Sequence, residues 1–469
     1  MRVAFAQNLW EGQNGPLLLA QVLESQGHEV RFFLPERGWF EAMARFRPRV
    51  LAVSLCTNQH AWALDVAARA KKALSEPPLV VFGGPHPTFF PEIISHAAVD
   101  AVCLGEGESS FPRLLAAVNG SFTRTDVENF WIKKDGHIFK NPLGPLIEDL
   151  DSLPIPSRKP LYDHYPFIRS SPFKKTVAGR GCPFNCNYCF NRKYRQMVKG
   201  KGPYVRLRSP EHLIEEIRYL KREFGLRFID INDDIFTLDK DWLARFADLY
   251  PREAGVPFGC NVHVRYMDAD VAEMLKQAGC SLVKFGLETA NEKVRKDILN
   301  KHISNEDIRR CAAALRSRGI PFQTYNMLGI PWESMTDARE TLHLNQEIAP
   351  AYAWSSLAQP YPGTRLAEMC LAQGMAGPEN GYTAVSPSWF ASSVLDFPHR
   401  RRMVNFQKFF AFLVRFPRLQ PLAELLSRLP PNVFFRLFSQ FIYGTSMRRV
   451  ARTGRFRALR LFLKNRKHY

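Results

Sequence analysis

The stretch GRGCPFNCNYCFNRKYR, residues 179–195, places three of the chain's nine cysteines, Cys182, Cys186 and Cys189, within eight residues. No run of eighteen apolar residues occurs in the chain, and its first residues lack the apolar core and cleavage site of a signal peptide. We therefore expect a cytoplasmic protein whose cysteines are reduced thiols or metal ligands and not disulfides.

The spacing C-x3-C-x2-C has three interpretations. A structural zinc site takes four protein ligands, so the fourth ligand would have to come from elsewhere in the chain. Three unliganded cysteines are unexpected at such regular spacing beside Gly, Pro and Asn. Iron–sulfur clusters are held by Cys thiolates, and three thiolates on a [4Fe–4S] cluster would leave one iron open to a substrate or cofactor.

Downstream of the triad, short apolar runs alternate with helical patterns, which is typical of a barrel of parallel strands. The six predicted strands cover residues 175–180, 228–233, 257–264, 281–288, 321–329 and 353–361. Each has a helical pattern near it, so we predict an open (β/α)6 barrel within residues 174–385. The triad directly follows the first strand, at the face where such barrels hold their chemistry.

Residues 1–140 show a second alternation of buried strands and helices, which predicts a doubly wound, Rossmann-like α/β domain. A hairpin with an Asp135-Gly136 turn is expected at its end. Ligands of such sheets bind beyond the carboxyl ends of the strands. The Pro-rich residues 141–173 are predicted to be a linker between the two domains.

The segment CPFNCNYC, with Tyr188 as the aromatic residue before the last cysteine, resembles the C-x3-C-x-aromatic-C motif of the radical S-adenosylmethionine enzymes. The resemblance implies a [4Fe–4S] cluster on Cys182, Cys186 and Cys189, with S-adenosylmethionine bound to the open iron. Electron transfer from the cluster would then cleave this cofactor to methionine and a 5′-deoxyadenosyl radical.

The resemblance also implies contacts with S-adenosylmethionine at other strand ends. Asp233 and Asp234, in DINDDIF, would lie near the methionine amino group, although Asp234 could equally cap the next helix. Glu288, in KFGLET, is a candidate for the ribose or methionine end. Arg265 could bind the carboxylate or form a surface ion pair. Gly329, in MLGIP, would form the adenine platform, where the absence of a side chain allows close approach.

The stretches FGGPHPTFFPE and DAVCLGEGE resemble the cobalamin-binding domain that a large subgroup of these enzymes carries. Many such domains coordinate cobalt through the His of D-x-H-x-x-G. The only D-x-H here is Asp135-Gly136-His137, which has Lys140 in place of the final Gly and lies in the predicted hairpin. Cobalamin would therefore lack a His ligand from this motif.

The cobalamin would instead rest on backbone and polar contacts in the loops that follow the strands. The implied contact residues are Ser54, Thr57, Gly83, Gly84, Gly105 and Glu106. An empty Rossmann-like fold is the main alternative. A dinucleotide site is a weaker one, because no G-x-G-x-x-G follows the first strand.

A cobalamin domain together with a radical generator implies methylation of an unactivated carbon of a small-molecule or lipid-like substrate, through methylcobalamin and the 5′-deoxyadenosyl radical. Some relatives use both cofactors for cyclisation, rearrangement or oxidation without methylation, and this alternative stays open. A non-catalytic sensor with both cofactors is a third hypothesis. Reductive cleavage also implies an external electron donor such as flavodoxin or ferredoxin.

Residues 386–469 are predicted to form a basic helical segment. From Arg400 onward, 17 Lys and Arg residues stand against one acid, Glu424, so this segment holds most of the formal net charge of +19. One helical side carries the apolar residues Phe406, Phe409, Phe410, Leu413 and Phe416. We predict first a cap packed on the barrel, and second a peripheral contact with the inner membrane face. Nucleic-acid binding is least favoured, because no nucleic-acid module is present.

Overall fold

The computed structural model describes residues 1–119, 121–376, 386, 388, 390 and 392–451. The chain divides into two compact units, and the end of the predicted basic segment, residues 452–469, lies outside the described residues. Unit 1 comprises residues 1–171, 194–208 and 223–225, and unit 2 comprises the rest. The Pro-rich residues 141–171 belong to unit 1, where they contain α6 (Lys159–Tyr162) and α7 (Pro166–Arg169).

The main sheet of unit 1 has seven strands in the order β2-β1-β3-β4-β5-β8-β9. Its strands are β1 (Arg2–Ala6), β2 (Glu29–Phe33), β3 (Val50–Ser54), β4 (Leu79–Gly83), β5 (Ala101–Cys103), β8 (Phe130–Lys134) and β9 (His137–Lys140). The first five are parallel, and β8 and β9 run antiparallel at one edge. The order 2-1-3-4-5 is that of a doubly wound sheet, so the prediction for this region is confirmed.

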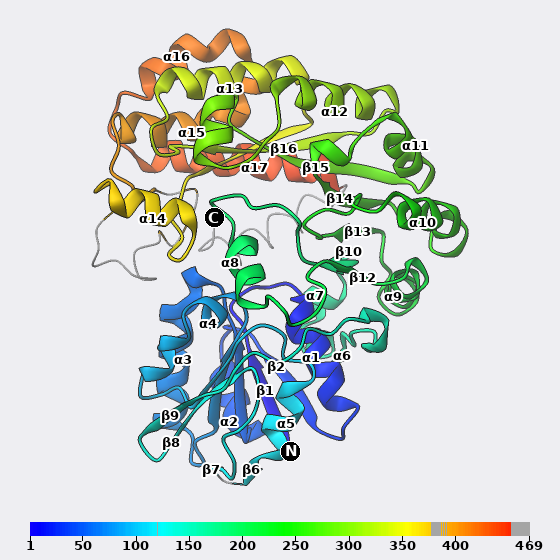
Figure 1. Ribbon diagram of the computed structural model, residues 1–469, viewed down its shortest axis with the longest axis vertical. Coiled ribbons are helices and arrows are strands. Elements are labelled where there is room, and N and C mark those ends of the chain that lie inside the picture. The colour runs from blue at the N-terminus through cyan, green and yellow to red at the C-terminus, as the bar shows by residue number, and fades with distance from the viewer. Residues whose placement is uncertain (120, 377–385, 387, 389, 391, 452–469) are drawn as a thin grey trace. The chain divides into compact units, whose positions relative to one another are not determined.

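Helices lie on both sides of this sheet (Figure 1). They are α1 (Asn14–Glu24), α2 (Trp39–Phe46), α3 (His60–Ala73), α4 (Pro85–Phe89) and α5 (Ser110–Ala116), and a short hairpin of β6 (Val118–Asn119) and β7 (Ser121–Phe122) follows α5. The predicted hairpin is β8–β9, in which Asp135 and Gly136 both have positive φ, at 50° and 76°. A two-residue turn in which both residues have positive φ matches the right-handed twist of the flanking strands.

Unit 2 is built on six parallel strands that neighbour one another in chain order, which confirms the predicted open (β/α)6 barrel. The strands are β10 (Phe173–Thr176), β13 (Phe228–Ile231), β14 (Phe258–Val262), β15 (Cys280–Glu288), β16 (Phe322–Leu328) and β17 (Tyr352–Leu357). The connecting helices are α8 (Phe190–Met197), α9 (Pro210–Phe224), α10 (Lys240–Glu253), α11 (Ala269–Gln277), α12 (Asn305–Ser317) and α13 (Met335–Ile348), and α14 (Arg365–Ala372) follows β17.

The first barrel strand differs from its prediction over residues 175–180. It begins earlier and ends at Thr176, and Gly179–Arg180 forms a separate short strand, β11, outside this sheet. The physical reason is the carboxylate of Asp233, which accepts hydrogen bonds from the backbone N–H groups of Ala178 (2.7 Å) and Gly179 (3.1 Å). These N–H groups therefore bind a side chain in place of a neighbouring strand, and the chain turns into the cysteine loop.

The C-terminal helices begin with α15 (Arg400–Arg415), which contacts β17 and α13. Its apolar side is buried in the core of unit 2, including Phe406, Phe410 and Leu413, all 0% exposed. The predicted cap is therefore confirmed for α15. Phe416, expected on the same side, is instead 46% exposed, because the helix ends at Arg415 where Pro417 follows.

Two more helices follow, α16 (Gln420–Leu426) and α17 (Val433–Ala451). Glu424 on α16 pairs with Arg339 on α13 (3.0 Å) and with Arg402 on α15 (3.1 Å). The segment's one acid is thus already neutralised by contacts that fasten α16 to its neighbours. Among the described residues, no helix has both the length and the apolar character needed to cross a bilayer.

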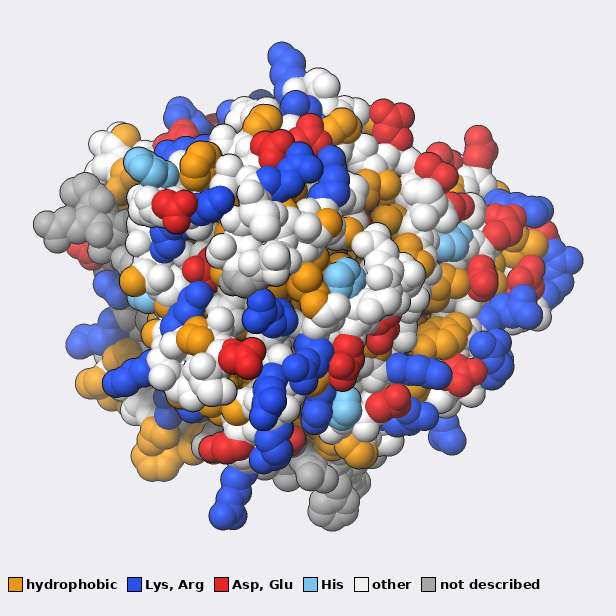
Figure 2. Space-filling model, turned by 90° about the horizontal axis from the view of Figure 1, so that it is seen from below, with side chains coloured by type: hydrophobic (Ala, Val, Ile, Leu, Met, Phe, Trp, Pro, Cys, Tyr) orange, Lys and Arg blue, Asp and Glu red, His pale blue; other side chains and the backbone are white. Residues whose placement is uncertain are grey.

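One face of the molecule is mixed in charge. On the face drawn in Figure 2, Lys and Arg side chains are interspersed with Asp and Glu side chains. This mixing agrees with the sequence, in which the basic excess is concentrated after Arg400.

Candidate cluster and cofactor sites

The three motif cysteines lie in one loop of unit 2, between β11 and α8, and all three side chains are partly exposed. None of them forms a disulfide. Burial, reinforced by the nearby acid Asp234 and the other two thiols, raises the pKa of Cys182 to about 12. Burial likewise raises the pKa of Cys189 to about 11. Three neighbouring thiols of this kind become thiolates together only when a cationic group joins them, as an iron–sulfur cluster does.

Within the described residues, no group of three or more His, Cys, Asp or Glu side chains is arranged to hold a metal ion as it stands. The three cysteines still fit a cluster with an open iron. They provide three soft sulfur ligands in one loop, and all three side chains are partly exposed to solvent.

Asn187 holds the cysteine loop in place. Its backbone N–H donates to the carbonyl oxygen of Leu299 (2.9 Å), and its carbonyl oxygen accepts from the N–H of Leu366 (2.9 Å). Its side-chain amide donates to the carbonyl oxygen of Ile298 (2.9 Å), and its side-chain oxygen accepts from Arg192 (2.8 Å). The loop is therefore positioned by segments far away in the sequence, and not only by its own turn residues.

Two further contacts join the loop to the ends of neighbouring strands. The ring of Phe184 stacks on His263, with centroids 3.9 Å apart, and burial lowers the pKa of His263 to about 3. The imidazole is therefore neutral, and its Nδ1 accepts from the N–H of Arg265 (3.3 Å). Asp234 accepts a hydrogen bond from the side chain of Asn191 (3.0 Å).

Tyr188 reaches a buried ion pair at the end of β15. Its hydroxyl donates to Glu288 Oε1 (3.0 Å), which also accepts from Lys301 Nζ (2.8 Å). Glu288 and Lys301 are only 7% exposed, and Glu288 has a φ of 66°. The predicted residues Tyr188 and Glu288 are thus brought together, and Lys301, which the sequence analysis did not single out, completes the contact.

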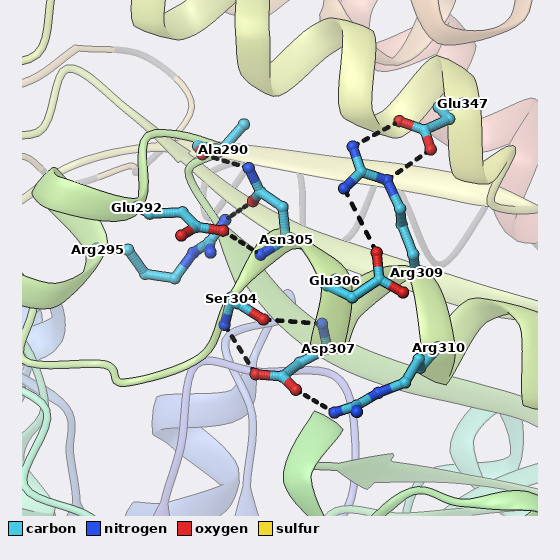
Figure 3. A network of polar contacts seen from close by, with 10 residues as sticks. All are labelled: Ala290, Glu292, Arg295, Ser304, Asn305, Glu306, Asp307, Arg309, Arg310 and Glu347. Atoms are coloured by element: carbon cyan, nitrogen blue, oxygen red, sulfur yellow. Dashed lines mark hydrogen bonds and ion pairs between the residues drawn. The ribbon is translucent and has the colours of Figure 1, made fainter.

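The chain after β15 is held by Arg295, which is 0% exposed. Its guanidinium donates to the carbonyl oxygens of Thr289 (2.9 Å) and Ile303 (2.9 Å) and to the side chain of Asn305 (2.6 Å). Figure 3 shows this group beside the start of α12, where Ser304 and Asp307 cap each other's backbone. These contacts fix the loop that carries Lys301 relative to the strand that carries Glu288.

Asp233 and Asp234 have different surroundings. Asp233 is 5% exposed and binds the backbone that leads into the cysteine loop, as described above. Asp234 is exposed and does not cap α10, whose N-terminal cap is Asp239, with its carboxylate accepting from the N–H of Trp242. Of the two interpretations of Asp234, helix capping is therefore wrong. Arg265 is exposed in a short 3₁₀ turn after β14.

Gly329 follows β16 with a φ of 69°. A Cβ atom at this position would lie 2.7 Å from the ring of Phe397, so the close approach expected here is made by the chain's own aromatic ring. The Gly329 N–H donates to Glu333 (2.6 Å), which is 4% exposed. Burial raises the pKa of Glu333 to about 8, although the N–H groups of Ile330 and Gly329 oppose this shift.

The barrel strands carry polar residues that the sequence analysis did not select. Lys284 on β15 donates to Asp230 on β13 (2.6 Å), and this pair is largely buried. Tyr325 on β16 donates to Asn261 on β14 (3.2 Å). The signal was present in the sequence, because a lysine within the apolar run SLVKFGLE must find a partner once the strand is buried.

In unit 1, the predicted cobalamin contacts follow adjacent strands. Ser54 ends β3 and is paired in register with Gly83, which ends β4. Gly84 has φ 89° and ψ −168°, a conformation essentially limited to glycine, and a Cβ there would lie 2.7 Å from Ser54 Oγ. Glycine at this position therefore allows the loops after β3 and β4 to pack closely against each other.

Thr57 lies in a buried cluster with two histidines. His60 donates from Nδ1 to the Thr57 carbonyl oxygen (2.6 Å), and the rings of His60 and His86 stack with centroids 5.5 Å apart. His86 is 0% exposed, and burial lowers its pKa to about 3. The contacts of these histidines are those of packed, hydrogen-bonding side chains.

Glu106 has a structural role in unit 1. Its carboxylate accepts two hydrogen bonds from Arg206, at 2.7 and 3.1 Å, and one from the N–H of Ile147 (3.0 Å). The preceding Gly105 donates its N–H to Thr88 Oγ1 (2.9 Å). Gly105 also faces Tyr194, whose hydroxyl would lie 2.7 Å from an added Cβ.

Comparisons with known proteins agree with this architecture. Residues 13–115 match the B12 binding domain, and residues 176–344 match the radical SAM superfamily. An uncharacterized methyltransferase of Pyrococcus horikoshii is 29% identical over 399 residues, which cover 80% of this chain and 83% of that protein. An anaerobic magnesium-protoporphyrin IX monomethyl ester cyclase of Rubrivivax gelatinosus is 28% identical over 297 residues, or 61% of this chain and 52% of the cyclase.

Among solved structures, the chain is similar to the radical S-adenosylmethionine methyltransferase TsrM of Kitasatospora setae, described with cobalamin and a [4Fe–4S] cluster bound. The TM-score is 0.66 at 16% identity, covering 79% of this chain and 78% of TsrM, and a likeness at this identity shows the fold. A B12 binding domain, a following radical SAM domain and an intact cysteine motif are now all established. The chain therefore belongs to the cobalamin-dependent radical S-adenosylmethionine enzymes, whose cofactors are a [4Fe–4S] cluster, S-adenosylmethionine and cobalamin.

Proposed function

We propose that this enzyme methylates an unactivated carbon of a small-molecule or lipid-like substrate. The observation that carries this proposal is the union, in one chain, of the cysteine motif at the start of a half-barrel with a B12 binding domain. The name of the Pyrococcus relative, which covers most of this chain, supports the same reaction. When bound, the cofactors would supply the carbon-centred radical chemistry and the methyl group.

The chain's own residues bind and orient the cofactors. Cys182, Cys186 and Cys189 hold the cluster, and Asn187 keeps their loop against the barrel. Asp234, whose carboxylate is exposed beside this loop, binds the methionine amino group, whereas Asp233 positions the backbone before the loop. Tyr188 and Lys301 fix Glu288 at the ribose or methionine end. The backbone at Gly329, with the ring of Phe397 packed against it, contributes the adenine platform, and Arg265 contacts the cofactor carboxylate.

In unit 1, the loops after β3, β4 and β5 bind cobalamin through short side chains and backbone. The contact residues in this proposal are Ser54, Thr57, Gly83, Gly84 and Gly105. Glu106 acts through Arg206, which positions the loop. An external donor such as flavodoxin or ferredoxin supplies the electron.

Methyl-labelled S-adenosylmethionine tests this proposal. The anaerobically reconstituted protein, with a reductant, cobalamin and candidate substrates, should transfer label to product and release 5′-deoxyadenosine. Cys186→Ala should abolish both, because it removes a ligand of the cluster. A product that is rearranged or oxidised but unlabelled would overturn methylation.

That unlabelled outcome is the second candidate function. The name of the Rubrivivax relative is that of a cyclase, and 61% of this chain aligns with it. A ring-forming or oxidising reaction would release 5′-deoxyadenosine with no label in the product. The labelling experiment therefore separates the two reactions.

We also propose that the C-terminal helices contact an anionic membrane at the inner membrane face. Nine large apolar side chains within residues 416–441 are exposed. They are Phe416, Leu419, Leu422, Leu425, Leu429, Val433, Phe434, Leu437 and Phe441, of which Phe434 is 75% and Phe441 65% exposed. The same segment holds Arg418, Arg428 and Arg436, and apolar side chains beside basic ones suit a bilayer surface with anionic lipids.

Sedimentation with vesicles of phosphatidylglycerol and phosphatidylcholine tests this contact. The full chain should sediment with them, less so in Phe434→Ser and less so at high salt. Phe139→Ser is the matched control, because Phe139 is exposed on β9, outside this segment. Equal sedimentation of the two variants would contradict the proposal.

A further inference from the structure

A pocket outside the cluster site lies between β17, α15 and α17. Its empty volume, including the open mouth, is about 590 Å³. Polar lining comes from Ser355, Gln407, Lys408 and Arg436, and apolar and aromatic lining includes Tyr352 and Tyr443. Neither Lys408 nor Arg436 belongs to the cluster loop or to any predicted cofactor site.

Both charged groups of this pocket are cations. Lys408 is 8% exposed, and its ammonium group donates to the side-chain oxygen of Gln407 (2.8 Å). The amide of Gln407 in turn donates to the carbonyl oxygen of Ser355 (2.7 Å). The edge strand β17 therefore positions the side chain that binds the lysine. Among the described residues that line the pocket, there is no Asp or Glu.

This arrangement differs from that of two other buried lysines in unit 2, Lys284 and Lys301. Lys284 and Lys301 each contact a carboxylate, at 2.6 and 2.8 Å. Among the described residues, Lys408 contacts a neutral acceptor, and a second cation, Arg436, lines the same pocket. Burial, together with the charge of Arg436, lowers its pKa to about 8. A buried cation without an anion is costly, so a negatively charged ligand would be stabilised here.

We propose that this pocket binds a small oxyanion, a phosphate or carboxylate group, carried by a ligand with an apolar body. Lys408 would act as a buried point charge, and the Arg436 guanidinium would provide paired N–H donors from α17. The apolar body would lie against Tyr352 and Tyr443. Because the two cations come from different helices, the ligand would also hold α17 against the barrel, and this site does not depend on the methylation proposed above.

Calorimetric titration of the full-length, reconstituted protein tests the site with phenyl phosphate as the probe. The wild-type protein should bind phenyl phosphate more tightly than phenol. Arg436→Gln and Lys408→Gln should each weaken binding at least tenfold, because each removes a charge-assisted contact. Arg37→Gln is the matched control: it removes one positive charge from an exposed position of unit 1 outside the pocket and should change binding less than twofold.

Equal binding by Arg436→Gln and Arg37→Gln would overturn the proposal, as would phenol binding as tightly as phenyl phosphate. Because Arg436 is exposed, Arg436→Gln should fold. The comparison of the two arginine variants therefore remains valid even where Lys408→Gln does not fold. Short-chain phosphatidic acid, below its micelle concentration, distinguishes the source of the oxyanion. If phosphatidic acid binds more tightly than phenyl phosphate, and this binding depends on Arg436, the oxyanion is a lipid headgroup. If phosphatidic acid binds more weakly, the ligand is a soluble molecule.

Discussion

The sheet of unit 1 is doubly wound and that of unit 2 is a half-barrel, and the two also differ in what the carboxyl ends of their parallel strands present. The sheet of unit 2 carries charged side chains at this end: Glu288 pairs with Lys301, and Asp233 binds the backbone that leads into the cysteine loop. The sheet of unit 1 ends in small residues, with Ser54 beside Gly83 and Gly84. We therefore expect one edge to act through side-chain groups, and the other through backbone and shape.

This difference matches the cofactors of the family. A cluster and a charged sulfonium cofactor need thiolates and ionic partners at defined positions. Cobalamin is much larger, and small residues at the strand ends, such as Gly83 and Gly84, would let it approach the backbone. The comparison predicts that unit 2 is sensitive to the removal of charge or sulfur, whereas unit 1 is sensitive to the addition of bulk.

The largest expected effect is the loss of the cluster in Cys186→Ala. The variant should lose most of its iron and all 5′-deoxyadenosine formation, because two thiolates hold a cluster poorly. Iron content and visible absorbance after anaerobic reconstitution measure this. The matched control is Cys311→Ala, which removes a buried thiol of α12. Retention of full iron by Cys186→Ala would contradict the assignment of the ligands.

The next effect concerns the buried pair of Glu288 and Lys301. Lys301→Met should lower the free energy of unfolding by about 3–5 kcal/mol, because it leaves a buried carboxylate without its cation. A double-mutant cycle with Glu288→Gln, followed by urea denaturation, measures the coupling. The exposed pair Arg245–Glu211 is the control and should couple by only about 0.2–1 kcal/mol. Equal coupling of the two pairs would remove the distinction between the buried edge and the surface.

In unit 1, Gly84→Ala should lower the free energy of unfolding by about 2–4 kcal/mol and weaken cobalamin binding, because the added Cβ meets Ser54 Oγ. Gly27→Ala is the matched control, with a φ of 79° and nothing within 4 Å of an added Cβ. It should cost only about 1–2 kcal/mol from the backbone conformation. Unfolding curves and the absorbance of bound corrinoid measure both variants, and identical behaviour would show that the close contact is unimportant.

The smallest effect is a pH dependence from Glu333. Its pKa is raised from 4.5 to about 8 in the folded chain, so the folded state keeps a proton that the unfolded state has released. The free energy of unfolding should therefore fall as the pH rises from about 5 to about 8. Urea denaturation at pH 6 and pH 9 should show a smaller fall for Glu333→Gln than for the wild type. An unchanged difference between the two pH values would contradict the raised pKa.

Periodicity predicted the two sheets and the hairpin, because buried parallel strands are short apolar runs and Asp135-Gly136 is a strong turn signal. It did not predict that the first barrel strand breaks after Thr176, because this break depends on Asp233, more than fifty residues later. Local patterns cannot contain such a contact.

The candidate site was predictable to the extent that it is a motif. The three cysteines and Tyr188 were found from their spacing, whereas Lys301 and Glu333 were not, because their roles depend on burial and on distant partners. Glu106 shows the opposite case: its loop position suggested a ligand contact, but its carboxylate binds Arg206. Phe416 was misplaced because the helix ends one residue before it.

The most direct test of the account is to measure 5′-deoxyadenosine in protein that holds a full [4Fe–4S] cluster, after addition of S-adenosylmethionine and a reductant. We expect 5′-deoxyadenosine to form in the wild-type chain and to be absent in the Cys182→Ala, Cys186→Ala and Cys189→Ala variants. Cluster-loaded wild-type protein that leaves S-adenosylmethionine intact, or a triad variant that cleaves it equally well, would contradict the open-iron site.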